Sequence, residues 1–309
     1  MRGELGGNST GAVAKLCGNC IFGEIASVSR THCALNREPA PPAKMSTQPQ
    51  SKISSLIEEL NEIRQKAGAD SFTLRRIKND AGKLKSNPLE FHLVMGIYRV
   101  VEGNPEGMRK HYKIAQEIAP SDVDLRSNFA ISLCDLGFYL EAREIMDDLH
   151  DLLRGDKKFL EEYGLNFYVT GRFKSALGII DELKTLQPAK PFLKKARIAK
   201  IAKFIEDNDI TEDEVEGYER VVEQFLQEKK IYGWLVEYEL LTDEESTTLV
   251  GDVLLWNTIE ETVKLSMELG RRIAELKIPF KVCNTVHFHL KSRETLEDGD
   301  YTDRVTQVL

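Results

Sequence analysis

Small residues recur every 34 residues through the middle of this chain of 309 residues, and this interval restricts the fold more than any other feature. Two separate series keep the interval: Gly96, Ala130 and Gly164 form the first, and Gly103, Gly137 and Gly171 form the second. Fixed periods of this length are typical of arrays in which each unit is one supersecondary motif that stacks on the next. The interval therefore predicts a mainly α chain built from stacked helical pairs.

The second unit, residues 128–149, shows what each helical pair requires. We expect its first helix to end near Leu136, where Gly137 supplies the left-handed backbone of a tight turn. A second helix then begins near Tyr139. The small Ala130 and Ala142 allow the two helices to approach closely, while larger apolar side chains fill the seam between them.

The same residues resemble the tetratricopeptide repeat family, whose consensus has small residues at two helix positions, a turn glycine, a following aromatic residue and a late proline. The third unit carries this set as Gly164, Gly171, Phe173, Ala176 and Pro188. The second unit matches it at Ala130, Gly137, Tyr139 and Ala142 and has Arg154 at the proline position. The first unit departs from it, because Pro105 stands at the aromatic position and Met108 at the second small position. The resemblance covers about residues 55–190 and implies an α-solenoid that binds other proteins.

Helical periodicity continues on both sides of these three units. Apolar residues at helical spacing occupy residues 53–63, a break follows at 67–70, and a second helix is expected over 72–84. Residues 192–205 and 215–230 form another expected pair, with Thr211 and Glu214 as a capping box. We therefore expect about five helical pairs in a repeat domain over residues 51–230.

The resemblance also implies an inner groove lined by particular positions of each first helix. These candidate partner-binding residues are mostly apolar: Leu93, Ile97, Val100, Ser127, Ile131, Cys134, Glu161, Leu165 and Tyr168. The lysine, asparagine and arginine set with which some family members capture a carboxyl terminus is missing. We therefore expect an apolar helix or an extended segment as the occupant. The alternative is that several of these side chains belong to the core between helices.

The period changes after residue 230, where a small α+β domain is expected over residues 231–291. Residues 231–241, 247–256 and 280–290 favour strands. Between the last two, Asn257 and Glu260 can cap a helix that Pro279 ends. One face of that helix carries Ile259, Val263, Gly270, Ile273 and Leu276. The predicted order is β-β-α-β, followed by a flexible tail at 292–309.

Two histidines in the last predicted strand, His287 and His289, offer an alternative function. Their spacing places both on one face of the strand, where two imidazoles can chelate one cation. No nucleophile signature or glycine-rich phosphate loop accompanies them. We interpret them as surface or interface residues, and keep an enzyme or metal-binding protein with a regulatory repeat domain as the alternative.

Residues 1–50 show no sustained period and are expected to be a disordered extension. Met45 is a plausible native start, so the residues before it would be an upstream over-translation. Cys17 and Cys20 with His32 and Cys33 suggest a zinc knuckle, although adjacent His32 and Cys33 make an awkward ligand pair. We favour unpaired thiols and predict no metal and no cofactor.

Charge and cysteine content exclude some partners. The net charge of −8 argues against nucleic acid as the main partner. A basic helix face does occur at Lys190, Lys194, Lys195, Arg197, Lys200 and Lys203. An acidic helix follows it, so we expect the two to neutralise each other. No run of about 18 apolar residues suggests a membrane helix, and five scattered cysteines favour the reducing cytoplasm.

These features together predict a function in protein interaction rather than catalysis. We expect a non-enzymatic scaffold or adaptor that binds another protein through its groove and its C-terminal domain. An assembly factor or a neutralising, antitoxin-like partner would fit this description.

Overall fold

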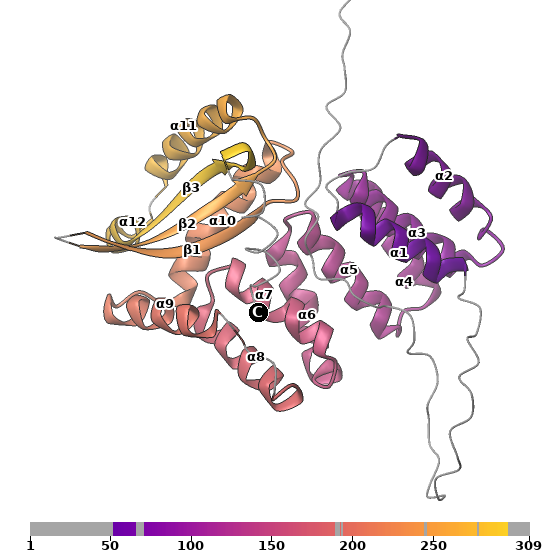
Figure 1. Cartoon of the computed structure of the whole chain (residues 1–309), viewed down its shortest axis with the longest axis horizontal. Coiled ribbons are helices and arrows are strands. Elements are labelled where there is room, and N and C mark those ends of the chain that lie inside the picture. The colour runs from indigo at the N-terminus through magenta and orange to yellow at the C-terminus, as the bar shows by residue number, and fades with distance from the viewer. Residues whose placement is uncertain are drawn as a thin grey trace, which may run out of the picture.

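The computed structural model describes residues 52–65, 71–188, 192, 194–243, 246–276 and 278–295. In this part the chain is mainly helical, with a three-stranded sheet near its C-terminal end (Figure 1). Several predictions concern residues outside it. These are the extension at 1–50 with the start at Met45, the knuckle of Cys17, Cys20, His32 and Cys33, the break at 67–70, Lys190, and residues 296–309 of the predicted tail.

Three helical pairs occupy the region of the 34-residue interval. They are α3 (Pro88–Val101) with α4 (Pro105–Ile118), α5 (Val123–Asp135) with α6 (Tyr139–Leu153), and α7 (Lys157–Val169) with α8 (Phe173–Leu186). The helices of each pair pack on each other, and each pair packs on the next. The second helices begin 34 residues apart, at residues 105, 139 and 173. The predicted helical pairs are confirmed here.

The turn glycines have the backbone that the sequence predicts. Gly103, Gly137 and Gly171 have φ angles of 66°, 82° and 76°, in the left-handed region that favours glycine. The small residues of the first series lie inside helices instead. A Cβ atom added at Gly96 would lie 2.8 Å from the ring of Tyr112. Glycine at this position therefore lets α3 and α4 approach closely.

The first two helices do not form a helical pair of their own. Both α1 (Lys52–Gln65) and α2 (Ser71–Gly82) pack on α3. They share with α3 a hydrophobic cluster separate from the main core, which includes Leu60, Ile77 and Tyr98. The two helices that were expected to form the first pair thus belong to a three-helix group built around α3.

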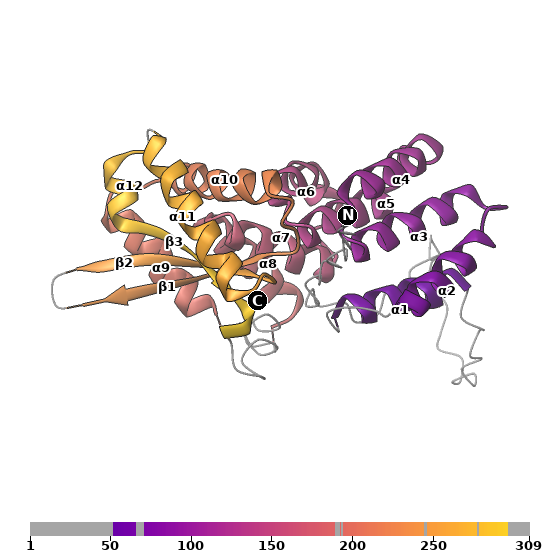
Figure 2. The same cartoon turned by 90° about the horizontal axis from the view of Figure 1, so that it is seen from above.

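The last predicted pair also differs from expectation. Helix α9 (Lys195–Asp207) packs on α8, whereas α10 (Glu212–Glu228) turns away from it. Figure 2 shows α10 between α11 and α6. The predicted capping box of Thr211 and Glu214 is confirmed. The described residues therefore contain three of the five expected pairs. The first expected pair is missing because α1 and α2 pack on α3, and the last because α10 packs against α6 and α8.

The expected neutralisation between the basic and acidic helices is wrong. On α9, Lys195 pairs with Asp181 of α8, and Arg197 pairs with Glu237 of β1. The acidic start of α10 pairs with other elements, since Asp213 contacts Arg172 and Glu214 lies 3.1 Å from Lys281. The charged residues of both helices therefore form ion pairs with elements that are distant from them in the sequence.

The sheet consists of β1 (Leu235–Thr242), β2 (Thr247–Leu255) and β3 (Val286–Ser292), in the order β1-β2-β3. Strands β1 and β2 are antiparallel, and β2 and β3 are parallel. In this register Tyr238, Gly251 and Phe288 lie side by side on one face. The crossover from β2 to β3 contains α11 (Ile259–Glu275) and α12 (Phe280–Thr285). The predicted order β-β-α-β holds, with one helix added.

Three boundaries in this region were predicted wrongly. Residues 280–285 are helical and not a strand, because Pro279 at the N-cap position starts a short helix that ends before β3. The cap of α11 is Thr258 with Glu261, one residue later than predicted. The chain is also ordered beyond residue 291, since Ser292 and Arg293 are buried and Arg293 lies 3.8 Å above the Trp256 ring.

The hydrophobic core does not divide at residue 230. One continuous cluster contains buried side chains of α5 to α10 together with those of the sheet, among them Tyr168, Val222 and Tyr238. The division in the core lies instead near α3, between this cluster and that of α1 to α3. The C-terminal module, which we define as residues 231–295, is therefore built into the repeats.

Candidate interaction site between the repeats and the C-terminal module

The turns of the second and third helical pairs contact the C-terminal module directly. We call these turns, residues 136–140 and 170–174, the repeat edge. At the first of them, a Cβ atom on Gly137 would lie 2.8 Å from Cδ1 of Trp234. The Tyr139 hydroxyl donates a hydrogen bond of 2.6 Å to the backbone oxygen of Trp234, which is itself buried. Glycine is thus required here both by its φ and by a neighbouring ring.

The second turn repeats this arrangement with different partners. A Cβ atom on Gly171 would lie 2.5 Å from Val215 of α10. The backbone N–H of Tyr238 donates to the Tyr168 hydroxyl at 3.0 Å, and the Tyr238 hydroxyl donates to the backbone oxygen of Val169 at 3.0 Å. Strand β1 therefore lies against the end of α7 and forms hydrogen bonds with buried polar groups there.

The caps of the second helices explain why α10 lies there. The N-cap position holds Asn104 in α4, Phe138 in α6 and Arg172 in α8, at the interval of 34 residues. Asn104 caps its own helix by accepting a hydrogen bond of 2.8 Å from the Gly107 N–H. Phe138 and Arg172 make no such side-chain bond. The N-termini of α6 and α8 consequently need acceptors from elsewhere.

Glutamates of α10 supply these acceptors. The Glu223 carboxylate accepts from the backbone N–H of Leu140 at 3.3 Å, in the first turn of α6. Glu212 accepts from the backbone N–H of Lys174 and, at 3.1 Å, from the Ser175 hydroxyl, in the first turn of α8. Carboxylates are favoured at helix N-termini by the unpaired N–H groups and the helix dipole. Helix α10 therefore caps two helices at once.

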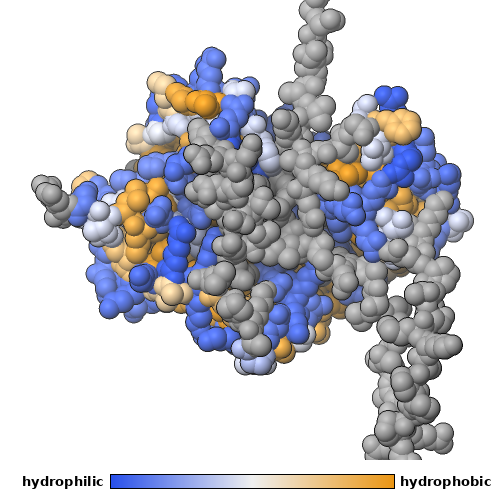
Figure 3. All heavy atoms as spheres, in the orientation of Figure 1, coloured by the Kyte–Doolittle hydropathy of each residue, from blue (hydrophilic) through white to orange (hydrophobic). Residues whose placement is uncertain are grey.

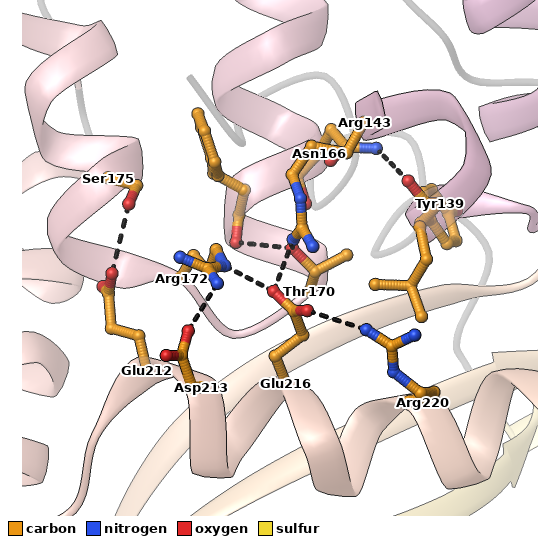
Figure 4. A network of polar contacts seen from close by, with 12 residues as sticks. Tyr139, Arg143, Asn166, Thr170, Arg172, Ser175, Glu212, Asp213, Glu216 and Arg220 are labelled. Carbon is orange, nitrogen blue, oxygen red and sulfur yellow. Dashed lines mark hydrogen bonds and ion pairs between the residues drawn. The ribbon is translucent and has the colours of Figure 1, made fainter. Parts of the chain in front are cut away.

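Between these two caps, Glu216 joins α10 to the repeats through arginines (Figure 4). Its carboxylate lies 2.7 Å from Arg143 of α6 and 3.1 Å from Arg220 of α10, and also pairs with Arg172. Burial would raise the pKa of Glu216, but hydrogen bonds from Arg143 and Arg172 outweigh it and hold that pKa below its ordinary value. Glu216 is therefore an ionised, nearly buried anchor.

The next acidic residue on this side of α10 has no such partner. Glu219 is fully buried, and neither of its carboxyl oxygens has a hydrogen-bond partner. Burial, together with the charges of Glu223 and Glu216, raises the pKa of Glu219 well above 4.5. Burial likewise raises the pKa of Glu223 to about 7. An uncharged carboxyl group at Glu219 is the form that this site accommodates.

The predicted groove residues lie mostly in the core. Five of the nine are buried, and they are Ile97, Val100, Ile131, Cys134 and Tyr168. Leu93 and Leu165 are partly buried against the core, while Ser127 and Glu161 are half-buried. At Tyr168, β1 of the same chain occupies the place that was expected for a partner. The alternative noted from the sequence, that these side chains fill the seam between helices, describes most of them.

His287 and His289 lie on β3 with ring centroids 6.5 Å apart. His289 is exposed, and its Nδ1 lies 3.7 Å from Oδ1 of Asp252 on the neighbouring strand. Asp252 pairs in turn with Lys291 at 2.5 Å. In the part of the chain that the structure describes, no group of three or more histidine, cysteine, aspartate or glutamate residues is placed to hold a metal ion.

The structure adds an exposed apolar surface on α11 that overlaps only partly with the helix face noted in the sequence. Ile259, Val263 and Met267 of α11 are 52%, 54% and 65% exposed. Gly270 and Ala274 continue the same side of the helix and are exposed too. Thr262 and Leu269 are buried instead. We call these five exposed residues the apolar face of α11, and apolar atoms are visible over this helix in Figure 3. A helical wheel of residues 259–275 places apolar residues on two sides of the helix, and this signal could have indicated the exposed surface from the sequence.

No protein-family model matches the sequence. Searches of curated proteins and of solved structures find no match either. None of the described helices is both long and apolar enough to cross a membrane.

Proposed function

We propose that this protein is a protein-binding scaffold, in which a tetratricopeptide-like α-solenoid carries the C-terminal module and α11 contacts the partner. The observation that carries the proposal is the apolar face of α11. Exposed apolar surface of this kind on a folded domain marks interaction sites more often than chance. Three large side chains at successive helical turns, Ile259, Val263 and Met267, make it continuous rather than scattered.

The shape of this face favours an apolar helix as the partner. Gly270 and Ala274 are small and exposed, and a Cβ atom on Gly270 would meet nothing within 4 Å. A second helix could therefore approach closely at this end and place larger side chains beside Met267. Charged residues, Glu260 and Lys264, border the face and form an ion pair at 2.7 Å. A polar rim around an apolar centre is typical of protein interfaces.

The repeats serve in this proposal as a rigid support. Because the module shares one core with α5 to α10, the face of α11 is held at a fixed position relative to the repeats. An adaptor, an assembly factor or a neutralising partner would each use such a fixed presentation. We place this activity in the cytoplasm, in keeping with the free thiols of Cys134 and Cys283.

A matched pair of variants tests the proposal. The tagged protein is purified from its native organism as wild type, as the double variant Val263→Asp and Met267→Asp, and as Leu152→Asp. Leu152 is 64% exposed on α6 and serves as the control for an added surface charge. We expect a stoichiometric protein partner with the wild type and the control, and loss of that partner with the double variant at unchanged melting temperature. Equal recovery of the partner by all three proteins would contradict the proposal.

A further inference from the structure

The centre of the contact between α10 and the repeats contains a group that opposes the contact whenever it is charged. Glu219 is 0% exposed and both of its oxygens lack partners. An isolated buried carboxylate is costly, so such a group takes up a proton instead. Glutamine or leucine would avoid this cost at the same position. The presence of glutamate therefore links the contact to proton binding.

The surroundings of Glu219 offer little compensation for its charge. On α10 itself, Glu216 and Glu223 repel a carboxylate and Arg220 attracts it. From α6, Arg143 attracts it, but Arg143 already lies 2.7 Å from Glu216. From β1, Tyr238 faces it with a hydroxyl that donates to Val169. Burial raises the pKa of Tyr238 well above its ordinary value, so its hydroxyl stays protonated near neutral pH.

Glu223 lies one helical turn from Glu219 and shares its environment. It is buried, accepts from Leu140 and from Gln227 at 2.8 Å, and faces the buried thiol of Cys134 from α5. These hydrogen bonds favour its ionised form, whereas its burial and the neighbouring Glu219 oppose it. Two carboxyl groups this close in a buried contact cannot both ionise without cost.

We propose that α10 is a proton-sensitive clasp, in which protonated Glu219 permits the closed contact between the C-terminal module and the repeat edge, and its ionisation favours local opening of that contact. This inference goes beyond the proposed function, because it concerns how the repeat edge becomes accessible. Opening would uncover the first turns of α6 and α8 together with Arg143 and Tyr168.

The direction of the pH dependence follows from linkage. In the open state Glu219 has its ordinary pKa of 4.5, whereas in the closed state burial raises that pKa well above 4.5. Opening therefore releases a proton, and stability of the contact is lost as pH rises from 4.5 towards the pKa of the closed state. For one proton the opening constant increases about tenfold per pH unit in this range.

Hydrogen exchange with mass spectrometry measures this opening constant in the full chain. Exchange of peptides from α10 and β1 is followed between about pH 7.5 and pH 9, above the pKa of about 7 that Glu223 has in the same contact, and is divided by the intrinsic rate at each pH. We expect an increase of about tenfold per pH unit in the wild type and none in Glu219→Gln. Peptides from α4 should show no such increase. Glu228→Gln, an exposed change on the same helix, should behave as wild type.

A pH-independent opening constant in the wild type would overturn the proposal, as would an unchanged slope in Glu219→Gln. If the glutamine variant does not fold by circular dichroism, Glu219→Leu takes its place and must likewise lose the slope. Tryptophan emission gives a second readout. In Trp256→Phe the remaining Trp234 reports on its contact with Gly137 and should redshift with pH, but should not do so once Glu219 is also replaced.

Discussion

The turn of the first helical pair and the turns of the next two have the same backbone but different surroundings. Gly103, Gly137 and Gly171 all have positive φ angles between helices of similar length. The turn at Gly103 closes with its own cap, Asn104. The turns at Gly137 and Gly171 have no cap of their own and receive glutamates from α10.

This difference shows how a repeated unit is adapted for contact with a further domain. A helix whose N-terminus is satisfied locally gains little from a distant carboxylate, whereas one with orphan N–H groups gains a charge-assisted hydrogen bond. Replacing the cap by Phe138 or Arg172 therefore makes the second and third pairs depend on α10. The first pair keeps Asn104 as its local cap. Its helix α3 packs on α1 and α2 in the separate cluster, while Met108, Tyr112 and Ala115 of α4 belong to the main core.

The largest effect that tests this comparison is expected at Glu216. Glu216→Ala leaves Arg143, whose side chain is 11% exposed, without its carboxylate partner, and should lower the free energy of unfolding by about 3 kcal/mol. Glu141 makes the corresponding contact between the first two pairs, with Arg109, but is 42% exposed. Glu141→Ala should cost less than about 1 kcal/mol. Urea unfolding followed by circular dichroism measures both, and equal losses would remove the distinction between the two regions.

A smaller difference is expected between two of the turn glycines. Gly103→Ala imposes a left-handed backbone on alanine, which costs about 1 kcal/mol. Gly137→Ala adds a steric conflict with Trp234 and should cost about 2 kcal/mol or more in total. Melting temperatures of the two variants, measured side by side, check the order. A Gly137 variant as stable as the Gly103 variant would mean that the Trp234 contact is easily relaxed.

The smallest effects concern the caps themselves. Asn104→Ala removes a local cap and should cost about 1 kcal/mol, and Glu212→Ala removes a cap supplied from α10 at a similar cost. The two losses differ in place, because only Glu212→Ala should increase hydrogen exchange in both α8 and α10. Glu144→Ala, an exposed change on α6, is the control and should stay within about 0.5 kcal/mol of wild type. If Glu212→Ala increases hydrogen exchange in α8 alone, the expected coupling between α8 and α10 is wrong.

Much of the helical part could be predicted from the sequence because its determinants are local. The turn glycines, the capping box of Thr211 and Glu214, and the start of α6 at Tyr139 each depend on residues within a few positions. The order β-β-α-β along the chain followed from segments rich in β-branched and aromatic residues for the same reason. The helix at 280–285 was missed because Val282 and Thr285 favour a strand, while Pro279 and the packing of Val282 decide for a helix.

The candidate site was predicted less well. The groove positions taken from the family resemblance are mostly buried, because β1 and neighbouring helices cover them. The acidic residues of α10 were expected to neutralise the basic face of α9, whereas Glu216 and Glu219 are buried. Nothing local distinguishes a buried glutamate from an exposed one, since the distinction depends on what lies opposite.

By itself, the sequence determined the repeating helical pairs, their left-handed turns and the later change to a small mixed sheet. Those features are set by short-range backbone preferences and by the spacing of apolar side chains. Only the tertiary structure decided that α10 crosses the repeat edge, that its glutamates cap two distant helices, and that one apolar side of α11 stays exposed. Contacts between segments far apart in the chain choose among surfaces that look alike in sequence, because burial and pairing depend on the opposing residue.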